Sequence, residues 1–119
     1  MNKLEDIKIW KKSIELAKNF YWLIQENKKI KQYHSLQDQF KRSCISISSN
    51  IAKLFWRKTN AEFSRFIDIT LWNLFEFKNQ LYLLKEINYI DQQIFSNFLE
   101  KTEYLEYMIK SLIKHLNSC

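Results

Sequence analysis

Apolar side chains recur every three or four residues in four long stretches of this chain. Such spacing places them on one face of an α-helix. We therefore expect helices over about residues 6–27, 36–57, 60–87 and 92–117. The expected buried face of the first helix consists of Ile7, Trp10, Ile14, Ala17, Tyr21 and Ile24. The expected buried face of the second helix consists of Leu36, Phe40, Cys44, Ile47, Ile51 and Phe55. That of the third consists of Phe63, Phe66, Ile67, Thr70, Leu74, Phe77, Leu81 and Leu84. That of the fourth consists of Ile94, Phe98, Leu105, Met108, Leu112 and Leu116.

Short polar segments separate the four stretches and carry helix-start signals. Residues 28–34 are polar and basic, which predicts a loop. We expect Ser35 to start the second helix, because it opens a sequence that resembles a capping box. Thr59 and Glu62 form a full capping box, and Asp91 is a suitable N-cap. Because short connections join antiparallel neighbours, the pattern predicts an all-α fold, an antiparallel up-down-up-down four-helix bundle.

The third expected helix is apolar on nearly all sides. Besides its main stripe it carries four apolar residues on what should be its outer face, namely Ile69, Leu71, Trp72 and Phe75. A helix that is apolar all round is buried on more than one side. We therefore expect another chain or a ligand to cover this face, with large aromatic residues as anchors. The candidate oligomer interface comprises Trp56, Ile69, Trp72 and Phe75.

Glycine and proline are both absent from the 119 residues. Loops that cradle phosphate groups need glycine for close backbone approach, and the turns of β-rich folds rely on both residues. Their absence argues against a P-loop, a dinucleotide-binding fold and a β-sandwich. The length is that of one domain, so we expect a single domain over residues 1–119.

Positive charge is concentrated in the first half of the chain. Residues 1–58 carry thirteen basic and five acidic side chains, whereas residues 59–119 carry six and eight, for a net charge of +6. If the first two helices are neighbours, one side of the bundle is basic and attracts polyanions such as RNA or DNA. The alternative is an ordinary lysine-rich surface. The candidate phosphate contacts are Lys8, Lys11, Lys12, Lys41, Arg42, Lys53, Arg57 and Lys58.

No arrangement of residues indicates catalysis or a bound cofactor. The two histidines do not indicate a metal site, because His34 falls in a predicted loop and His115 has only Cys119, at the chain end, four residues on. Cys44 lies within an apolar stripe and is expected to be a core thiol. We therefore expect a protein that is not an enzyme and uses no metal and no cofactor.

Nothing in the sequence directs the chain to a membrane or to a secretory route. The first residues turn acidic at once and no apolar signal core follows. No stretch reaches the roughly 18 apolar residues that a membrane span requires. With only two cysteines, reduced thiols are expected. We predict a cytoplasmic protein without a membrane partner.

Five polar residues fit structural roles as well as functional ones. Asn50 interrupts an apolar stretch and is expected to form a hydrogen bond between helices that fixes their register. Arg42 and Arg57 are suited either to ion pairs with Glu62 or Glu76, or to phosphate contact. Binding that weakens steeply with added salt would favour phosphate contact.

Residues 39–81 carry a more specific pattern, QFKRSCISISSNIAKLFWRKTNAEFSRFIDITLWNLFEFKNQL. It resembles the four-helix bundle proteins encoded in the intervening sequences of bacterial 23S ribosomal RNA genes. Residues 4–10, LEDIKIW, also resemble the start of these proteins. The residues that match the family pattern are Gln39, Arg42, Ser46, Ile47, Asn50, Ile51, Ala52, Arg57, Glu62, Phe63, Phe66, Ile69, Leu71, Glu76, Gln80 and Leu81.

The resemblance implies a four-helix bundle that assembles as a homopentameric ring and is not an enzyme. The family is also similar to the accessory protein of diversity-generating retroelements, a basic pentamer that binds nucleic acid and a reverse transcriptase. RNA, DNA and a protein partner such as a reverse transcriptase are therefore implied partners. The alternative is a structural homo-oligomer or protein-interaction module that binds no nucleic acid.

Three residues depart from the family pattern where its members carry glycine, namely Leu54, Trp56 and Trp72. A glycine within a helix often marks close approach of another backbone. Trp72 would block such an approach or fill the groove differently. The departures therefore bear on helix packing and on the number of subunits.

Overall fold

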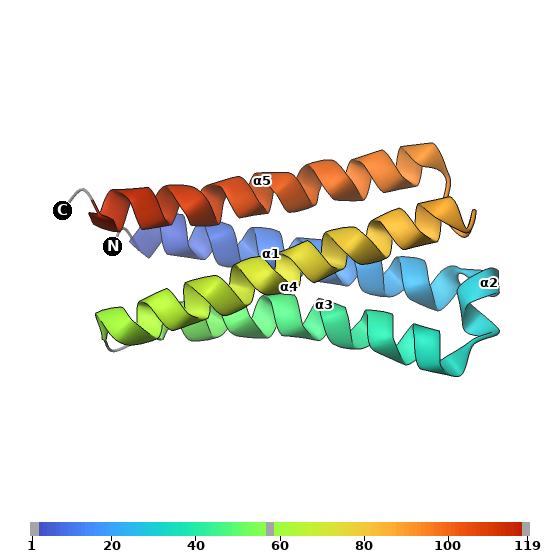
Figure 1. The fold of residues 1–119 in the computed structure, drawn as a ribbon, viewed down its shortest axis with the longest axis horizontal. Helices are drawn as coiled ribbons and strands as arrows, with labels where there is room; N and C mark the ends of the chain where they lie inside the picture. The colour runs from blue at the N-terminus through green and yellow to red at the C-terminus, as the bar shows by residue number, and fades with distance from the viewer. Residues whose placement is uncertain (1–2, 57–58, 118–119) are drawn as a thin grey trace.

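A computed structural model describes the backbone of residues 3–56 and 59–117 and the side chains of residues 6–56 and 59–114. Four long helices and one short helix make up the described chain, and no strand occurs in it. They are α1 (Lys3–Glu26), α2 (Lys28–Lys31), α3 (His34–Phe55), α4 (Asn60–Glu86) and α5 (Gln92–Asn117). Figure 1 shows that successive long helices run in opposite directions, which agrees with the predicted all-α bundle.

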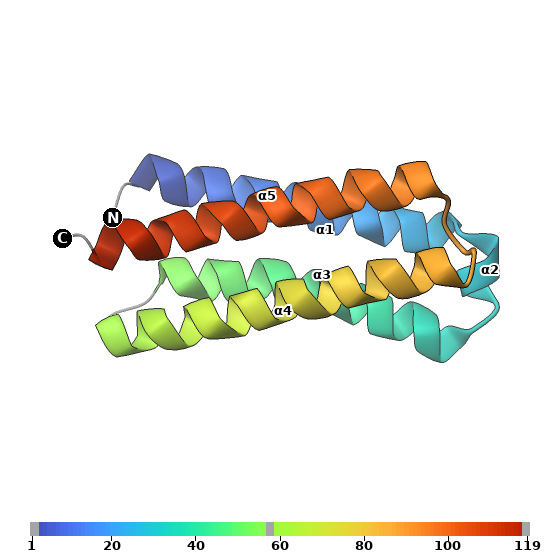
Figure 2. The same ribbon diagram turned by 45° about the horizontal axis from the view of Figure 1, so that its top comes forward.

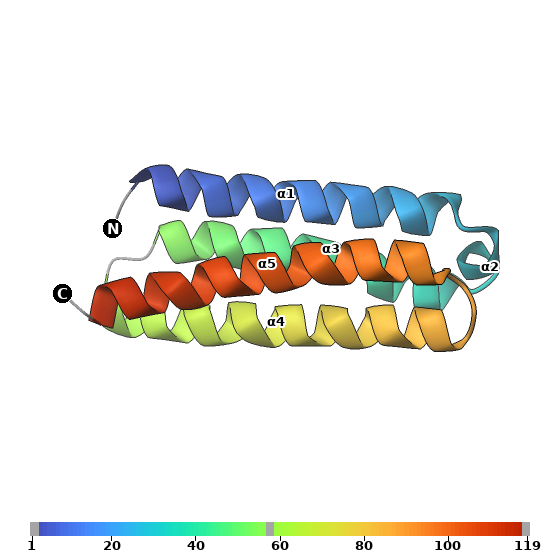
Figure 3. The same ribbon diagram turned by 90° about the horizontal axis from the view of Figure 1, so that it is seen from above.

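Each long helix has two of the other long helices as neighbours. Within the described residues, the backbones of α1 and α3, α3 and α4, α4 and α5, and α5 and α1 come close together, whereas those of the pairs α1–α4 and α3–α5 do not. Figures 2 and 3 show the same arrangement from two further directions. The four helices therefore stand at the corners of a square around one core, with α1 diagonal to α4.

Phe20 of α1 lies at the centre of this core and is fully buried. Its ring makes edge-to-face contacts with Phe40 of α3, Phe77 of α4 and Phe98 of α5, at centroid distances of 6.2, 4.5 and 5.6 Å. Such pairs contribute beyond the burial of their area. One aromatic cluster thus connects all four long helices.

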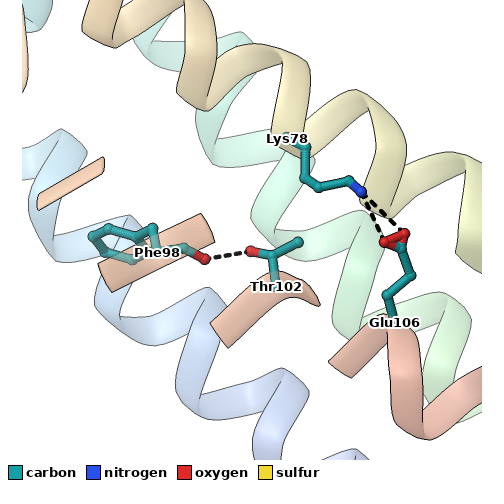
Figure 4. A network of polar contacts seen from close by, with 4 residues as sticks. All are labelled: Lys78, Phe98, Thr102 and Glu106. Carbon is teal, nitrogen blue, oxygen red and sulfur yellow. Dashed lines mark hydrogen bonds and ion pairs between the residues drawn. The ribbon is translucent and has the colours of Figure 1, made fainter. Parts of the chain in front are cut away.

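Three hydroxyl groups are buried in the core, those of Ser13, Thr70 and Thr102. Each donates a hydrogen bond of 2.7 Å to a carbonyl oxygen of its own helix, three or four residues earlier. Figure 4 shows the bond from Thr102 to the carbonyl of Phe98. Because every one of these hydroxyls has a partner, none carries the penalty of an unsatisfied buried polar group.

A half-buried ion pair joins α4 to α5 outside this core. The Nζ of Lys78 lies 2.8 Å from Oε1 of Glu106 and 3.1 Å from Oε2. The side chains are 23% and 15% exposed, and Figure 4 shows both oxygens turned toward the ammonium group. The pair fixes the two helices relative to each other on the side away from α1.

Two of the predicted helix starts are confirmed by side-chain hydrogen bonds. The Thr59 hydroxyl accepts from the backbone N–H of Glu62 at 3.1 Å, as the capping box predicts. The Asp91 carboxylate accepts from the N–H of Ile94 at 2.8 Å. Both bonds satisfy donors that a helix start leaves without an intrahelical partner.

Asn88 terminates α4 in place of the glycine that usually follows a helix. Its φ angle is +61°, in the left-handed region. The N–H of Tyr89 bonds the carbonyl of Leu84, and the N–H of Asn88 bonds the carbonyl of Lys85. This is the Schellman pattern, in which asparagine is the best substitute for glycine. A chain without glycine therefore still makes a tight helix end.

The predicted loop over residues 28–34 is wrong in its first part, which forms α2. The side chain of Asn27 caps this short helix by accepting from the N–H groups of Lys29 and Ile30. Its Nδ2 also donates to the carbonyl of Tyr89 at 2.8 Å, across the bundle end. Ile30 is fully buried. The cap and this buried residue give a polar segment a defined helical turn.

The predicted start of the second long helix at Ser35 is also wrong. Helix α3 begins at His34, and its N-cap is Tyr33, which has an extended backbone and no capping side-chain bond. The N–H of Gln37 already bonds the carbonyl of Tyr33 at 3.0 Å. The helical turn is therefore closed before the capping box could act.

The predicted buried face of the first helix is wrong for most of its residues. The buried residues of α1 are Ile9, Ser13, Leu16, Phe20 and Ile24. The residues predicted to be buried but found exposed are Ile7, Trp10, Ile14 and Tyr21. Both sets have helical spacing, so the pattern fits either. Packing explains the outcome, because a phenylalanine ring can be buried without a hydrogen-bond partner, whereas the Trp and Tyr side chains carry polar atoms that need one.

The predicted faces of the other long helices agree better with the structure. Buried residues of α3 and α4 that were predicted to be so are Phe40, Cys44, Ile47, Ile51, Phe63, Ile67, Thr70, Leu74, Phe77, Leu81 and Leu84. In α5 they are Leu105, Met108 and Leu112. Leu54, at a position where the family carries glycine, is fully buried. It therefore belongs to the core and not to the surface.

Candidate functional site

The candidate phosphate contacts of α1 lie close together. Lys8, Lys11 and Lys12 line one shallow hollow of about 320 Å³ with Ile7 and Glu15. All three lysines are exposed. The hollow is open to solvent and holds three positive charges against one negative charge, so it can receive an anion without desolvating the lysines.

Two of the predicted basic residues are already engaged with aromatic rings. The Nζ of Lys41 lies 4.9 Å from the ring centroid of Tyr21 and donates to Oε1 of Gln25 at 2.7 Å. The Nζ of Lys12 lies 5.9 Å from the ring centroid of Tyr104. Such cation–π contacts hold the ammonium groups against the bundle. Lys41 is thereby directed toward α1, and Lys12 toward α5.

Arg42 and Lys53 lie on a different side of α3. They are four residues before and seven residues after Ser46, so they share its helix face. The carbonyl of Ser46 accepts a bond from Nδ2 of Asn73 on α4, at 3.4 Å. Arg42 and Lys53 therefore lie on the α4 side of α3, and both are exposed. The structure does not bring them to the face that holds the α1 lysines.

Two other predicted contacts, Arg57 and Lys58, lie outside the described residues. The alternative of an ion pair between Arg42 and Glu62 or Glu76 finds no support, because no ion pair of Arg42 occurs in the described part of the chain. Arg42 is exposed and extends from the α4 side of α3. Its positive charge is therefore available to a ligand.

Asn50 does not make the predicted hydrogen bond between helices within the described residues. The amide that joins α3 to α4 is Asn73, which donates to the Ser46 carbonyl. Asn50 itself is half-buried. Of the two acidic residues of the family pattern, Glu62 receives the Thr59 cap through its backbone N–H, and Glu76 is exposed on α4.

The predicted interface residue Trp56 follows the last residue of α3 and is 84% exposed. It borders an open groove of about 630 Å³ between the end of α3 and the start of α1. The other residues that line this groove are Asp6, Ile7, Trp10, Ala52 and Phe55. Its lining is mostly apolar, so it is suited to an apolar side chain from outside the chain.

The other predicted interface residues lie on α4. Trp72 and Phe75 are 61% and 59% exposed, and their rings stack at 5.7 Å with an interplanar angle of 24°. Ile69 is half-buried. Monomeric proteins rarely leave stacked large aromatic side chains exposed without a function for them. The aromatic face that the sequence predicts on this helix is therefore present on the surface.

Two surface features differ from what the sequence predicts. The first is the row of exposed apolar residues on α1, which the apolar spacing assigns to the buried face although a second stripe of the same spacing is the one that is buried. The second is a hollow of about 320 Å³ between α1 and α5, lined by Lys12, Glu15, Leu16, Asn97, Glu100, Lys101 and Tyr104. Its two lysines and two glutamates balance in charge. Nothing in the sequence could place them together, because the two helices lie at opposite ends of the chain.

The chemistry of the remaining candidate groups is limited. Cys44 is buried, and burial raises the pKa of its thiol to about 12, which keeps it protonated and unreactive. Among the described residues, no three His, Cys, Asp or Glu side chains gather into a metal-binding group. No helix in the described segments combines the length and apolar character needed to cross a membrane.

Comparisons with known proteins agree with this fold. A crystal structure of a protein of unknown function from the S23 ribosomal protein family of Bacteroides thetaiotaomicron is similar, with a TM-score of 0.84 and 24% sequence identity. The similarity covers 92% of this chain and 98% of that chain, and at this identity it shows the fold alone. No curated protein sequence matches this chain significantly. The family pattern of the 23S rRNA-intervening sequence protein matches residues 5–111, and the chain therefore belongs to that family.

Proposed function

We propose that this protein is a non-enzymatic, self-associating helical scaffold of the cytoplasm whose basic half contacts RNA or DNA. The observation that carries the proposal is that α1 and α3 are neighbours. Both lie in residues 1–58, which hold thirteen basic and five acidic side chains. Within this half the net charge is +1 on α1, +3 on α2 and +2 on α3, so all three helices carry a positive surplus, which attracts phosphate groups.

Self-association is supported by the exposed aromatic residues of two helices. Trp56 at the end of α3 and the stacked Trp72 and Phe75 on α4 leave large apolar areas uncovered in one chain. Residues of these types dominate the energetics of protein interfaces. A homo-oligomer covers them, and the family resemblance favours a homopentamer among the possible sizes.

The first experiment measures the native mass of the purified protein together with its absorbance at 260 and 280 nm. We expect a mass several times that of the chain and an excess of 260 nm absorbance from bound nucleic acid. The second experiment measures binding to a structured RNA by fluorescence anisotropy over a range of salt concentrations. The affinity should fall steeply with salt, because each phosphate contact releases bound cations.

A matched pair of variants tests whether specific residues carry the contact. Arg42→Ala with Lys53→Ala removes two exposed charges from α3, and Lys110→Ala with Lys114→Ala removes two from α5. For two lost contacts to a duplex, the slope of log affinity against log salt should become shallower by about 2 in the α3 variant. An equal slope of log affinity against log salt in both variants would mean that the binding depends on the overall positive charge and not on Arg42 and Lys53. No binding at low salt would refute the nucleic-acid role.

The second candidate function is a purely structural homo-oligomer or protein-interaction module. The exposed aromatic residues favour it without any reference to charge. An oligomeric native mass without RNA or DNA binding would select this function. A protein partner such as a reverse transcriptase, which the family resemblance suggests, would then be the next ligand to test.

A further inference from the structure

The exposed apolar residues of α1 form a continuous row, here called the α1 seam: Ile7, Trp10, Ile14, Ala17 and Tyr21. Their spacing alternates between three and four residues, which is the spacing of a helix-packing seam. Four of them are exposed and Ala17 is half-buried. At its N-terminal end, the seam continues into the apolar groove beside Trp56. Yet the core of this chain uses the other stripe of α1, so the seam, which meets α3 at that groove and at the contact of Lys41 with Tyr21, stays partly uncovered within the described residues.

The second uncovered surface, here called the α4 aromatic face, comprises Trp72, Phe75 and Leu83. Leu83 is 46% exposed, and it lies about three helical turns beyond Trp72. The two aromatic rings stack on each other on the outer side of α4. This surface is therefore a raised apolar strip of a length similar to that of the α1 seam.

The charges around the two surfaces are opposite in sign. Between residues 7 and 22 of α1 the exposed charged residues are Lys8, Lys11, Lys12 and Lys18 against Glu15. Along α4 the exposed charged residues are Glu62, Arg65, Asp68, Glu76 and Glu86, so acidic residues outnumber basic ones by four to one. Lys11 and Lys18 border the α1 seam, and Asp68 and Glu76 each lie four residues from Trp72. These opposite charges favour contact between the α1 seam of one copy and the α4 aromatic face of another. They disfavour contact of either surface with the same surface of a second copy.

The two surfaces do not meet within one chain, because α1 and α4 are diagonal in the bundle and face each other across the core, where Phe20 contacts Phe77. We infer that the α1 seam of one copy packs against the α4 aromatic face of the next copy, in a head-to-tail contact repeated from subunit to subunit. Contact between unlike surfaces generates either a closed ring or an open filament. This inference rests on the proposed self-association and names the surfaces that perform it.

Two variants that each break one surface test the pairing. Ile14→Glu places a negative charge in the α1 seam, opposite Asp68 and Glu76. Trp72→Lys places a positive charge in the α4 aromatic face, opposite Lys11 and Lys18. Each purified variant alone should have the native mass of a monomer, because every subunit lacks one of its two surfaces. Circular dichroism should show unchanged helicity, since both substituted side chains lie on the surface.

Mixing the two variants in equal amounts gives the decisive result. The intact α4 face of Ile14→Glu can bind the intact α1 seam of Trp72→Lys, and growth then stops. We expect a dimer by native mass spectrometry, containing one chain of each variant. Tyr107→Lys, which changes an exposed residue of α5, is the control and should keep the wild-type mass.

A second test changes only charges and so leaves the apolar surfaces intact. Lys11→Glu with Lys18→Glu should weaken assembly, and adding Asp68→Lys with Glu76→Lys to the same chain should restore it. The wild-type protein can be an oligomer while the mixed variants stay monomeric or the single variants keep the full mass. Either result would overturn the proposed pairing of surfaces but not the proposed self-association. A monomeric wild-type protein would overturn the proposed self-association as well. Neither test substitutes Arg42 or Lys53, but Lys11 is itself a candidate phosphate contact, so the charge variants are judged by native mass in the absence of nucleic acid.

Discussion

Replacing Phe20 with alanine tests the central feature of the core most directly. Its side chain is fully buried and contacts one phenylalanine ring from each of the other three long helices. Deletion of a buried phenylalanine ring costs about 3–5 kcal/mol in other proteins. The three edge-to-face contacts place Phe20→Ala at the upper end, since each contributes about 0.5–1.5 kcal/mol beyond burial. We therefore expect a loss of about 5 kcal/mol.

A loss of this size should be easily measured, because a domain of this length has a total stability of about 5–15 kcal/mol. The assay is unfolding in urea, followed by circular dichroism at 222 nm, at one fixed protein concentration for all variants. A fixed concentration is needed because the proposed self-association would stabilise the folded state by mass action. The melting temperature should fall by on the order of 15 °C.

Trp22→Ala is the matched control, two residues along the same helix. Trp22 is 53% exposed and makes a ring contact only with its neighbour Tyr21 among the described aromatic pairs. Its loss should cost less than about 1 kcal/mol. Equal effects of the two substitutions, or a loss below about 1.5 kcal/mol for Phe20→Ala with an unchanged dependence on urea, would refute the assignment of the buried face of α1.

Three further predictions concern single contacts. Asn27→Ala should destabilise the protein in urea by about 1–2 kcal/mol, because it removes both the α2 cap and the bond to the Tyr89 carbonyl. Asn27→Asp keeps the cap and should lose only the stability that the bond to the Tyr89 carbonyl contributes. Lys78→Met should cost about 1–2 kcal/mol by leaving Glu106 half-buried without its cation, and adding Glu106→Met should recover most of that loss in a double-mutant cycle. In a Cys119→Ser background, Cys44 should resist a thiol reagent at pH 8 until urea unfolds the chain, since burial raises its thiol pKa to about 12; rapid reaction of the folded protein would contradict this burial.

The sequence predicted the helices of this protein well because its apolar spacing and capping residues act locally. Thr59 and Asp91 cap their helices as expected, since a cap depends on residues only three positions apart. Ser35 failed because the backbone of Tyr33 had already started the turn, which no side-chain pattern reveals. Local signals thus locate the helices, while their exact first turns depend on tertiary contacts.

The faces of the helices were predictable only where one stripe was clearly more apolar than the rest. In α4 the main stripe from Phe63 to Leu84 is buried as predicted except for the half-buried Phe66, and the second apolar set supplies the exposed Trp72 and Phe75. In α1 two stripes of similar strength compete, and the choice depends on which ring fits among Phe40, Phe77 and Phe98. That fit involves helices far apart in the sequence, so periodicity alone could not decide it.

The candidate basic surface was predictable in charge but not in arrangement. Charge counts place the positive surplus in residues 1–58, and the two long helices of that segment, α1 and α3, are indeed neighbours. A charge count does not show that Lys41 and Arg42 lie on different sides of α3. That follows from their positions, because successive residues of a helix point in different directions. The contact of Lys41 with Tyr21 and the position of Arg42 beside α4 follow from that separation.

The three residues that replace glycines of the resembled family pattern are divided between the core and the surface of the subunit. Leu54 is fully buried, so it contributes to the core of its own subunit. Trp56 and Trp72 are largely exposed, so they contribute little to that core and alter the surface instead. If the surfaces that contain the tryptophans join the subunits, substituting either tryptophan should change the native mass while leaving the monomer folded. Leu54→Gly should act in the opposite way, by lowering the stability of every subunit whatever its state of assembly.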